Sequence, residues 1–271
     1  MSIADDIKRS CAEKNIATDQ VAFEIEKELN KLFYLKPKPK AEGKFITQVL
    51  LKNGEALERT GLHASAIIVG DKEFCYREQV LSLFYKMTQG GNIPISLKRI
   101  FEEGNAIHEK WQKLFIRGGF GTWEDMDLSR QADDYDMTYS PDAVLHDFMG
   151  KDWVVEIKSM NTFAFQHAID HPSGRHQLEL YEHFTKIHNG FVLAEDKNTQ
   201  KIKVFVHNYD IGEIDQYLER LDNVKAYKAR LQLKHKLCKG RCKNAECVRA
   251  SKCNMRDACF NVGEGRQKLQ K

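Results

Sequence analysis

The chain has 271 residues, of which 30% are charged and 42% hydrophobic, an ordinary composition for a globular protein. No apolar run approaches the roughly 20 residues that a membrane-spanning helix needs, and the start, MSIADD, lacks the basic and apolar regions of a secretory signal. We therefore expect a cytoplasmic protein with no membrane segment. The formal net charge of +3 excludes little by itself.

Residues 1–35 predict a helix, because apolar side chains recur there every three to four positions. The segment KPKPK at 36–40 ends it, since proline lacks an N–H and restricts the residue before it. We interpret residues 1–61 as a helical arm and a linker. Docking to a partner and an extra layer on the fold remain alternative roles for this arm.

Two helices are predicted next, over 74–87 and after Pro94. In the second, a buried stripe is expected from Leu97 through Ile100, Phe101 and Ile107 to Phe115. His108 lies within that stripe, and Gly104 precedes it by one turn. A missing side chain at Gly104 would let another backbone approach closely.

Strands are predicted over 136–147 and 153–160, with a hairpin turn over 148–152. Alternation in the second strand places Glu156 and Lys158 on one face and Trp153, Val155 and Ile157 on the other. A helix over 175–188, strands over 191–194 and 202–206, and a helix from Asp210 to about 237 follow. This order predicts an α/β (α+β) domain.

The predicted hairpin brings Asp142 and Glu156 side by side, and two neighbouring carboxylates repel unless a cation lies between them. Mg²⁺ and Mn²⁺ prefer such oxygen ligands. His108 would add an imidazole from the helix, and Lys158 would assist the attacking water or the phosphate charge. Each fragment alone is more often a core histidine, a turn or a surface ion pair. Their order and spacing together predict a metal-dependent phosphodiester hydrolase.

These residues resemble the PD-(D/E)xK nucleases, and within them the RecB-like branch. The matching motifs are Gly104…His108, Pro141-Asp142, Glu156-Ile157-Lys158 and Gln177…Tyr181. The resemblance implies a restriction-endonuclease-like core sheet flanked by helices over residues 62–237. It also implies Mg²⁺ or Mn²⁺ bound by the residues His108, Asp142, Glu156 and the carbonyl of Ile157.

The resemblance implies that Lys158 acts in catalysis together with Glu156 and Asp142. Gln177 and Tyr181 lie one helical turn apart and would position the DNA backbone or the active site. Arg175, at the start of the same helix, is a further candidate for substrate binding. A half-exposed amphipathic helix is the alternative interpretation of this segment.

Five cysteines crowd into residues 238–259, which favours zinc or an iron–sulfur cluster over disulfides. The iron–sulfur-containing nucleases of CRISPR systems and phages, and the AddB-type nuclease domain, offer a resemblance. They combine one cysteine upstream of the nuclease motifs with three at the C-terminal end. The implied [4Fe–4S] ligands are Cys75, Cys253, Cys259 and one further cysteine.

For that further ligand we rank Cys247 above Cys242 and Cys238, because the usual Cys-x-x-Cys is absent here. A zinc site made only of C-terminal cysteines stays open. In either case the basic tail, 238–271, would be closed back onto the nuclease domain by the metal.

Between Lys225 and Arg256 there are eleven Lys or Arg and one acid, Glu246. Such a segment suits a polyanion, although a solvated helix face with a tail is the alternative. The leading hypothesis is a metal-dependent DNA nuclease, an exonuclease on single-stranded ends by analogy, in a bacterial or phage-infected cell. The alternatives are a nuclease-fold DNA-binding subunit of a recombination, replication or CRISPR adaptation complex, with protein partners, and a redox or metal sensor.

Overall fold

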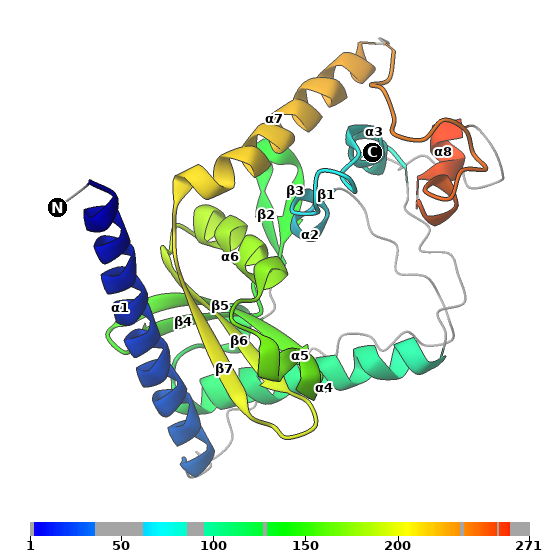
Figure 1. Cartoon of the computed structure of the whole chain (residues 1–271). Helices are drawn as coiled ribbons and strands as arrows, with labels where there is room; N and C mark the ends of the chain where they lie inside the picture. Colours follow the sequence, from blue (N-terminus) through cyan, green and yellow to red (C-terminus); the bar gives the residue numbers. More distant parts are fainter. Residues whose placement is uncertain are drawn as a thin grey trace. The chain divides into compact units, whose positions relative to one another are not determined.

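The computed structural model describes residues 3–35, 62–85, 95–126, 129–233, 236–253 and 255–260 (Figure 1). The contacts divide the chain into two units, each made from separate segments. The first comprises Met1–Gly43, Ile95–Leu128 and Ser140–Asp210, and the second Lys44–Pro94, Ser129–Tyr139 and Ile211–Lys271. The division at 61/62 and 237/238 expected from the motifs stays a prediction, and the expected linker at 36–40 lies outside the described residues.

A four-stranded mixed sheet forms the centre of the first unit. Its strands, in the order in which they pair, are β4 (Ala143–Phe148), β5 (Lys151–Met160), β6 (Asn189–Asp196) and β7 (Ile202–Asn208). β5 and β6 are parallel, and both outer pairs are antiparallel. The parallel pair needs a crossover, which contains α5 (Thr162–His167) and α6 (Pro172–Thr185).

The hairpin between β4 and β5 turns at Met149 and Gly150, which have φ values of 54° and 76°. A two-residue turn with left-handed backbone at both positions matches the twist of the flanking strands. The predicted turn and the predicted alternation are confirmed, because Trp153, Val155 and Ile157 all belong to the hydrophobic core.

Helices cover this sheet on both faces. α1 (Ile3–Lys31) continues into a 3-10 turn, η1 (Leu32–Tyr34), and contributes Ile25 and Leu29 to the core. α4 (Ile95–Gly118) contributes Trp111 and Phe115 to the same core. α6 packs on β5 and β6 from the face that carries Lys158, since Gln177 of this helix bonds that lysine. The predicted α/β class, a sheet flanked by helices, is confirmed.

The second unit contains a three-stranded sheet in the order β1 (Leu62–His63), β3 (Met137–Tyr139), β2 (Arg130–Ala132). Its helices are α2 (Ala64–Ile67), α3 (Tyr76–Ser82), α7 (Ile211–Gln232) and α8 (Arg256–Phe260). Short 3-10 turns complete the chain: η3 (Trp123–Asp125), η4 (Asp133–Tyr135) and η5 (Ala250–Lys252). None of the helices in the described part of the chain is long and apolar enough to cross a membrane.

Buried Arg220 of α7 fixes the loop that leads into α3. Its guanidinium donates to the carbonyls of Ile67 and Val69 at 2.5 and 2.7 Å, and it lies 2.6 Å from Asp71 Oδ1. The same group stacks 4.5 Å above the ring of Phe74. Through these contacts, α7 sets the position of the neighbouring Cys75.

Three sequence predictions are wrong in detail. The single strand expected over 136–147 is two strands, β3 and β4, because Pro141 lacks an N–H for a ladder and Ser140–Asp142 leave the strand path. The stripe expected on α4 is buried only from Ile107 onward, while the earlier Leu97, Ile100 and Phe101 are exposed. The helix expected over 74–87 forms only over Tyr76–Ser82 among the residues described there.

The close approach expected at Gly104 is also absent. A Cβ built there would lie 3.5 Å from Ser159 Oγ, an ordinary contact. At Gly190, by contrast, a Cβ would collide with Glu182 Oε1 and lie 2.9 Å from the side chain of Leu178. Both of these neighbours are fully buried on α6. Of these two glycines, Gly190 is therefore the one that close packing requires.

We expect Gly190→Ala to lower the free energy of unfolding by about 1–3 kcal/mol, because buried neighbours must move. Gly104→Ala should raise it by up to about 1 kcal/mol, because alanine favours a helix interior over glycine. Urea unfolding of the two variants beside the parent measures both effects. Equal stability of the two variants would contradict this assignment of the close contact.

Candidate functional site

Asp142 and Glu156 are brought together where β4 begins. The pairing of β4 with β5 ends at Ala143, opposite Val155. Just beyond this residue pair, the Asp142 carboxylate accepts a hydrogen bond from the Ile157 N–H at 2.6 Å. It thereby makes the hydrogen bond that a paired strand would otherwise make. Asp142 is 8% exposed and Glu156 3%. Two carboxylates are therefore buried at one point of the sheet.

α4 contacts Asp142 at two points. His108 Nδ1 lies 3.1 Å from Asp142 Oδ1, and Gln112 Nε2, one turn later, donates to the Asp142 carbonyl at 2.9 Å. The helix is itself fixed to β6 by Glu195, which is bonded by Lys110 Nζ at 2.5 Å and Trp111 Nε1 at 2.6 Å. Gln112 was not predicted as a site residue, although its spacing of four from His108 was a usable signal.

Lys158 connects the carboxylates to α6. Its Nζ lies 2.5 Å from Glu156 Oε1 and 2.7 Å from Gln177 Oε1. Gln177 Nε2 donates in turn to Tyr181 Oη at 3.3 Å. Tyr181 is only 2% exposed, so it supports Gln177 from inside the protein.

The loop before α6 adds a residue that sequence reasoning missed. His171 caps the helix, because its Nδ1 accepts from the Gly174 N–H at 3.1 Å. Burial, and then the charge of Lys158, lower the pKa of His171. Arg175, expected to bind substrate, lies with its Nε 3.8 Å from Asp170 Oδ2 and from Glu179 Oε1. These contacts direct Arg175 toward acids of its own loop and helix.

Burial dominates the electrostatics of the carboxylates. It raises the pKa of Glu156 to about 8, and the charge of Asp142 adds to this effect, while Lys158 opposes it. For His108, burial acts to lower the pKa, but the charge and hydrogen bond of Asp142 outweigh it, so the pKa is raised. The site thus stabilises additional positive charge next to two acids.

The chemical types of these donor groups suit a hard cation. Carboxylate oxygens and an imidazole are ligands for Mg²⁺ or Mn²⁺. In this arrangement, however, Asp142 is bonded by His108 and the Ile157 N–H, and Glu156 by Lys158. Accordingly, no three His, Cys, Asp or Glu side chains within the described ranges are placed to hold one metal ion together. Metal binding would have to exchange these hydrogen bonds for coordination.

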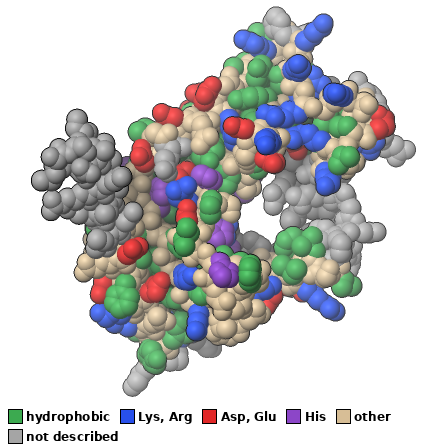
Figure 2. Space-filling view, viewed as in Figure 1, with side chains coloured by type: hydrophobic (Ala, Val, Ile, Leu, Met, Phe, Trp, Pro, Cys, Tyr) green, Lys and Arg blue, Asp and Glu red, His purple; other side chains and the backbone are tan. Residues whose placement is uncertain are grey.

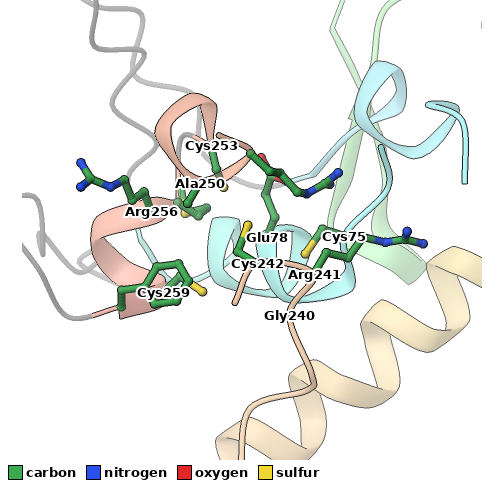
Figure 3. A pocket seen from close by; sticks show the side chains of 12 residues that line it. Cys75, Glu78, Gly240, Arg241, Cys242, Ala250, Cys253, Arg256 and Cys259 are labelled. Atoms are coloured by element: carbon green, nitrogen blue, oxygen red, sulfur yellow. The ribbon is translucent and has the colours of Figure 1, made fainter. Parts of the chain in front are cut away.

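The cysteines gather in the second unit. Four of them, Cys75, Cys242, Cys253 and Cys259, line a cavity of about 320 Å³ (Figure 3). Cys247 does not line it, and its Sγ accepts from the Ala250 N–H at 3.3 Å. Three cysteines of the expected set therefore lie around one cavity, with Cys242 in place of the fourth.

Arg77 joins two parts of this cysteine region. Its Nε donates to the Cys238 carbonyl at 2.7 Å, and its Nη1 lies 3.7 Å from Cys259 Sγ. Burial, followed by the charge of Glu78, raises the pKa of Cys253 to about 12. Ionisation of that thiol would therefore need a bound cation.

Solved structures that resemble this chain include an alkaline exonuclease and SSO0001. An alkaline exonuclease from Laribacter hongkongensis, LHK-Exo, aligns over 64% of this chain and 92% of its own, with 17% identity and a TM-score of 0.46. Its complex with dAMP aligns over the same shares with 15% identity and a TM-score of 0.46. SSO0001 aligns over 78% of this chain and 88% of its own, with 13% identity and a TM-score of 0.38. No protein-family model and no curated protein matches the chain. Likenesses of this size carry no argument about activity.

A buried network of charged side chains fixes α6 to β7. His207 Nδ1 lies 2.9 Å from Glu182 Oε2, and His207 Nε2 lies 3.5 Å from Glu179 Oε1. Both glutamates are fully buried. Burial acts to lower the pKa of His207, but its bonds to Glu179 and Glu182 prevail and raise it from 6.5 to about 10. Since α6 carries Gln177 and Tyr181, this network supports the candidate site.

We expect the His207 network to stabilise the fold most at low pH. The folded pKa is raised, so its contribution is complete below about pH 6.5 and is lost as the pH rises through about 10. His207→Gln should cost about 3–5 kcal/mol at pH 6, because two buried acids lose their cation. The same substitution should make the free energy of unfolding less dependent on pH, as measured by urea unfolding between pH 6 and 10.

The matched control is His146→Gln. That side chain is half exposed and lies 3.2 Å from Asp125 and 3.4 Å from Asp152, so its loss should cost under about 1 kcal/mol. A His207→Gln protein whose stability curve runs parallel to that of the parent would contradict this account.

Proposed function

We propose that this protein is a divalent-metal-dependent deoxyribonuclease that hydrolyses phosphodiester bonds. The observation that carries the proposal is the buried pair of acids, Asp142 and Glu156, with His108 on one side and Lys158 on the other. This is the donor set of the resembling nuclease family, and the residues come from a helix and a hairpin as that family requires.

A purely structural ion pair is the weaker interpretation. Removing two carboxylates from water costs several kcal/mol per ion, and a single lysine compensates for only part of that cost. The site keeps Glu156 at a pKa of about 8, so the acid is poorly stabilised as an anion without a further cation. Such a destabilised group in a cluster of titratable side chains is typical of a catalytic site.

The residues that would hold Mg²⁺ or Mn²⁺ are His108, Asp142, Glu156 and the carbonyl of Ile157. A bound cation would supply a Lewis acid and lower the pKa of a coordinated water. Lys158 has three N–H donors, and Glu156 and Gln177 accept two of them. The third would orient a water or a phosphate oxygen and stabilise the negative charge that develops there.

The preferred substrate in this proposal is a single DNA strand with a free end. The basic segment 225–256 supports a polyanion, and contacts with the phosphate backbone need no particular sequence. Protein partners in a recombination or CRISPR adaptation complex are a further part of the proposal.

We expect Lys158→Ala to reduce DNA cleavage by at least about a hundredfold, because a fixed cation next to the transferring phosphate is lost. The measurement is release of product from end-labelled single- and double-stranded DNA with Mg²⁺ or Mn²⁺. Lys151→Ala is the matched control, since Lys151 is an exposed lysine of the same strand.

Cleavage by the Lys158→Ala protein at the parental rate would refute the proposal. The same assay with linear and circular single strands tests the requirement for an end. A strict exonuclease leaves the circles intact, and rapid cleavage of circles would replace the exonuclease assignment by an endonuclease.

We also propose that Cys75, Cys242, Cys253 and Cys259 hold an iron–sulfur cluster. All four line one cavity, yet no three groups in the described part of the chain could share a single metal ion. Zinc needs four sulfurs at about 2.3 Å from one point, whereas a cluster distributes its thiolates over several irons. The choice of the cluster over zinc rests on the resemblance to the iron–sulfur-containing nucleases.

We expect Cys242→Ser to lose most of the bound iron and the visible sulfur-to-iron absorbance of anaerobically purified protein. Cys247→Ser should keep both, because Cys247 does not line the cavity. Metal analysis and an absorbance spectrum of each variant are sufficient. The reverse result would restore Cys247 as the ligand, and stoichiometric zinc without iron would overturn the cluster.

A further inference from the structure

A second hollow lies beside the cysteine cavity and carries a different chemistry. This open groove is lined by Lys72, Lys239, Gly240, Arg241 and Arg249. Four of its five described lining residues are cations, and none is an acid. Figure 2 shows Lys and Arg side chains gathered over the second unit, which contains this groove.

The cations come from three separate segments that are held together. Arg249 Nη1 donates to the Lys72 carbonyl at 2.8 Å, and its Nη2 donates to the Glu73 carbonyl. This bond fixes the cysteine-bearing segment against the loop before Cys75. Lys72, Lys239 and Arg241 are exposed at the rim. Like charges held close together without an acid repel each other, so an anionic ligand would relieve the repulsion.

The presence of four cations along the groove favours several phosphates over one small anion. Arg241 and Lys239 flank Gly240, and Arg241 extends away from the sulfur atoms of the neighbouring cavity (Figure 3). Cations spread around a hollow can each meet a different phosphate of a strand.

We infer that this groove binds the sugar-phosphate backbone of single-stranded DNA, through Lys72, Lys239, Arg241 and Arg249. The choice of DNA rests on the proposed nuclease function. The groove itself shares no residue with the Lys158 site, so it contributes affinity without taking part in the chemistry. Its contacts to phosphate carry no sequence information.

Two triple variants of equal charge change test this inference. Lys72→Gln/Lys239→Gln/Arg241→Gln removes three exposed cations of the groove. Lys236→Gln/Lys243→Gln/Lys252→Gln removes three exposed cations of the same basic segment that do not line it. Both are made in full-length Lys158→Ala protein, and binding of a labelled 20-nucleotide single strand is followed by fluorescence anisotropy over a range of salt concentrations.

We expect the groove variant to bind roughly ten- to a hundredfold more weakly, and its slope of log affinity against log salt to fall by about 2, as three lost contacts to a single strand predict. The control triple should stay within about twofold. Equal weakening by both triples would mean diffuse charge attraction, and unchanged binding in the groove variant would mean no contact. Either result overturns the inference.

The double variant Lys239→Gln/Arg241→Gln, compared with Lys236→Gln/Lys243→Gln, replaces the triples if the first triple does not fold. Binding is measured in a protein that does not cleave DNA. The nuclease proposal and the groove proposal can therefore be refuted independently of each other. A protein that binds through the groove but never cuts DNA refutes the nuclease alone. A protein that cuts DNA but binds it equally well without the groove cations refutes the groove alone.

Discussion

The fit of Asp142 against the edge of β5 is the contact on which the candidate site depends. One oxygen accepts the Ile157 N–H and the other meets His108. The first bond replaces strand pairing where β4 begins, and the second ties a helix to the same point. Because the Asp142 carboxylate makes a hydrogen bond that a neighbouring strand would otherwise make, it is buried beside Glu156. The sheet edge and the acidic cluster are therefore one structural feature, and neither can be changed without the other.

That dependence explains why the site is supported from several elements. Glu195 anchors α4 by accepting from Lys110 and Trp111, which fixes the helix that carries His108. On the other face, His207 anchors α6 through Glu179 and Glu182, and α6 carries Gln177 to Lys158. Both anchors are buried charges with partners, and such pairs define one geometry more than they add stability. A site with two carboxylates in repulsion needs this rigidity to keep its shape.

Local periodicity predicted much of this arrangement. Positions two apart in a strand share a face, so the pairing of Glu156 with Lys158 could be predicted, as could the hydrogen-bonded Gln177 and Tyr181 at a spacing of four. The residues that pack against each face of a helix or strand could not be predicted in this way. Phe101 continues the helical stripe of Trp111 yet is exposed, because periodicity does not show where the sheet ends. His171 and His207 were missed for the same reason, since their partners lie far away in sequence or arise only from packing.

The cysteines show this limit most clearly. Spacing along the tail ranks Cys247 above Cys242, but the ligand set of a cavity is decided by where the chain bends. Arg249 bends it here, by bonding the carbonyls next to Cys75, and the thiol of Cys247 then turns to the Ala250 N–H. The same arginine lines both the cysteine cavity and the basic groove. The contacts of Arg249 thus shape both the cavity that the cysteines line and the groove of cations, so a change at Arg249 would alter both together.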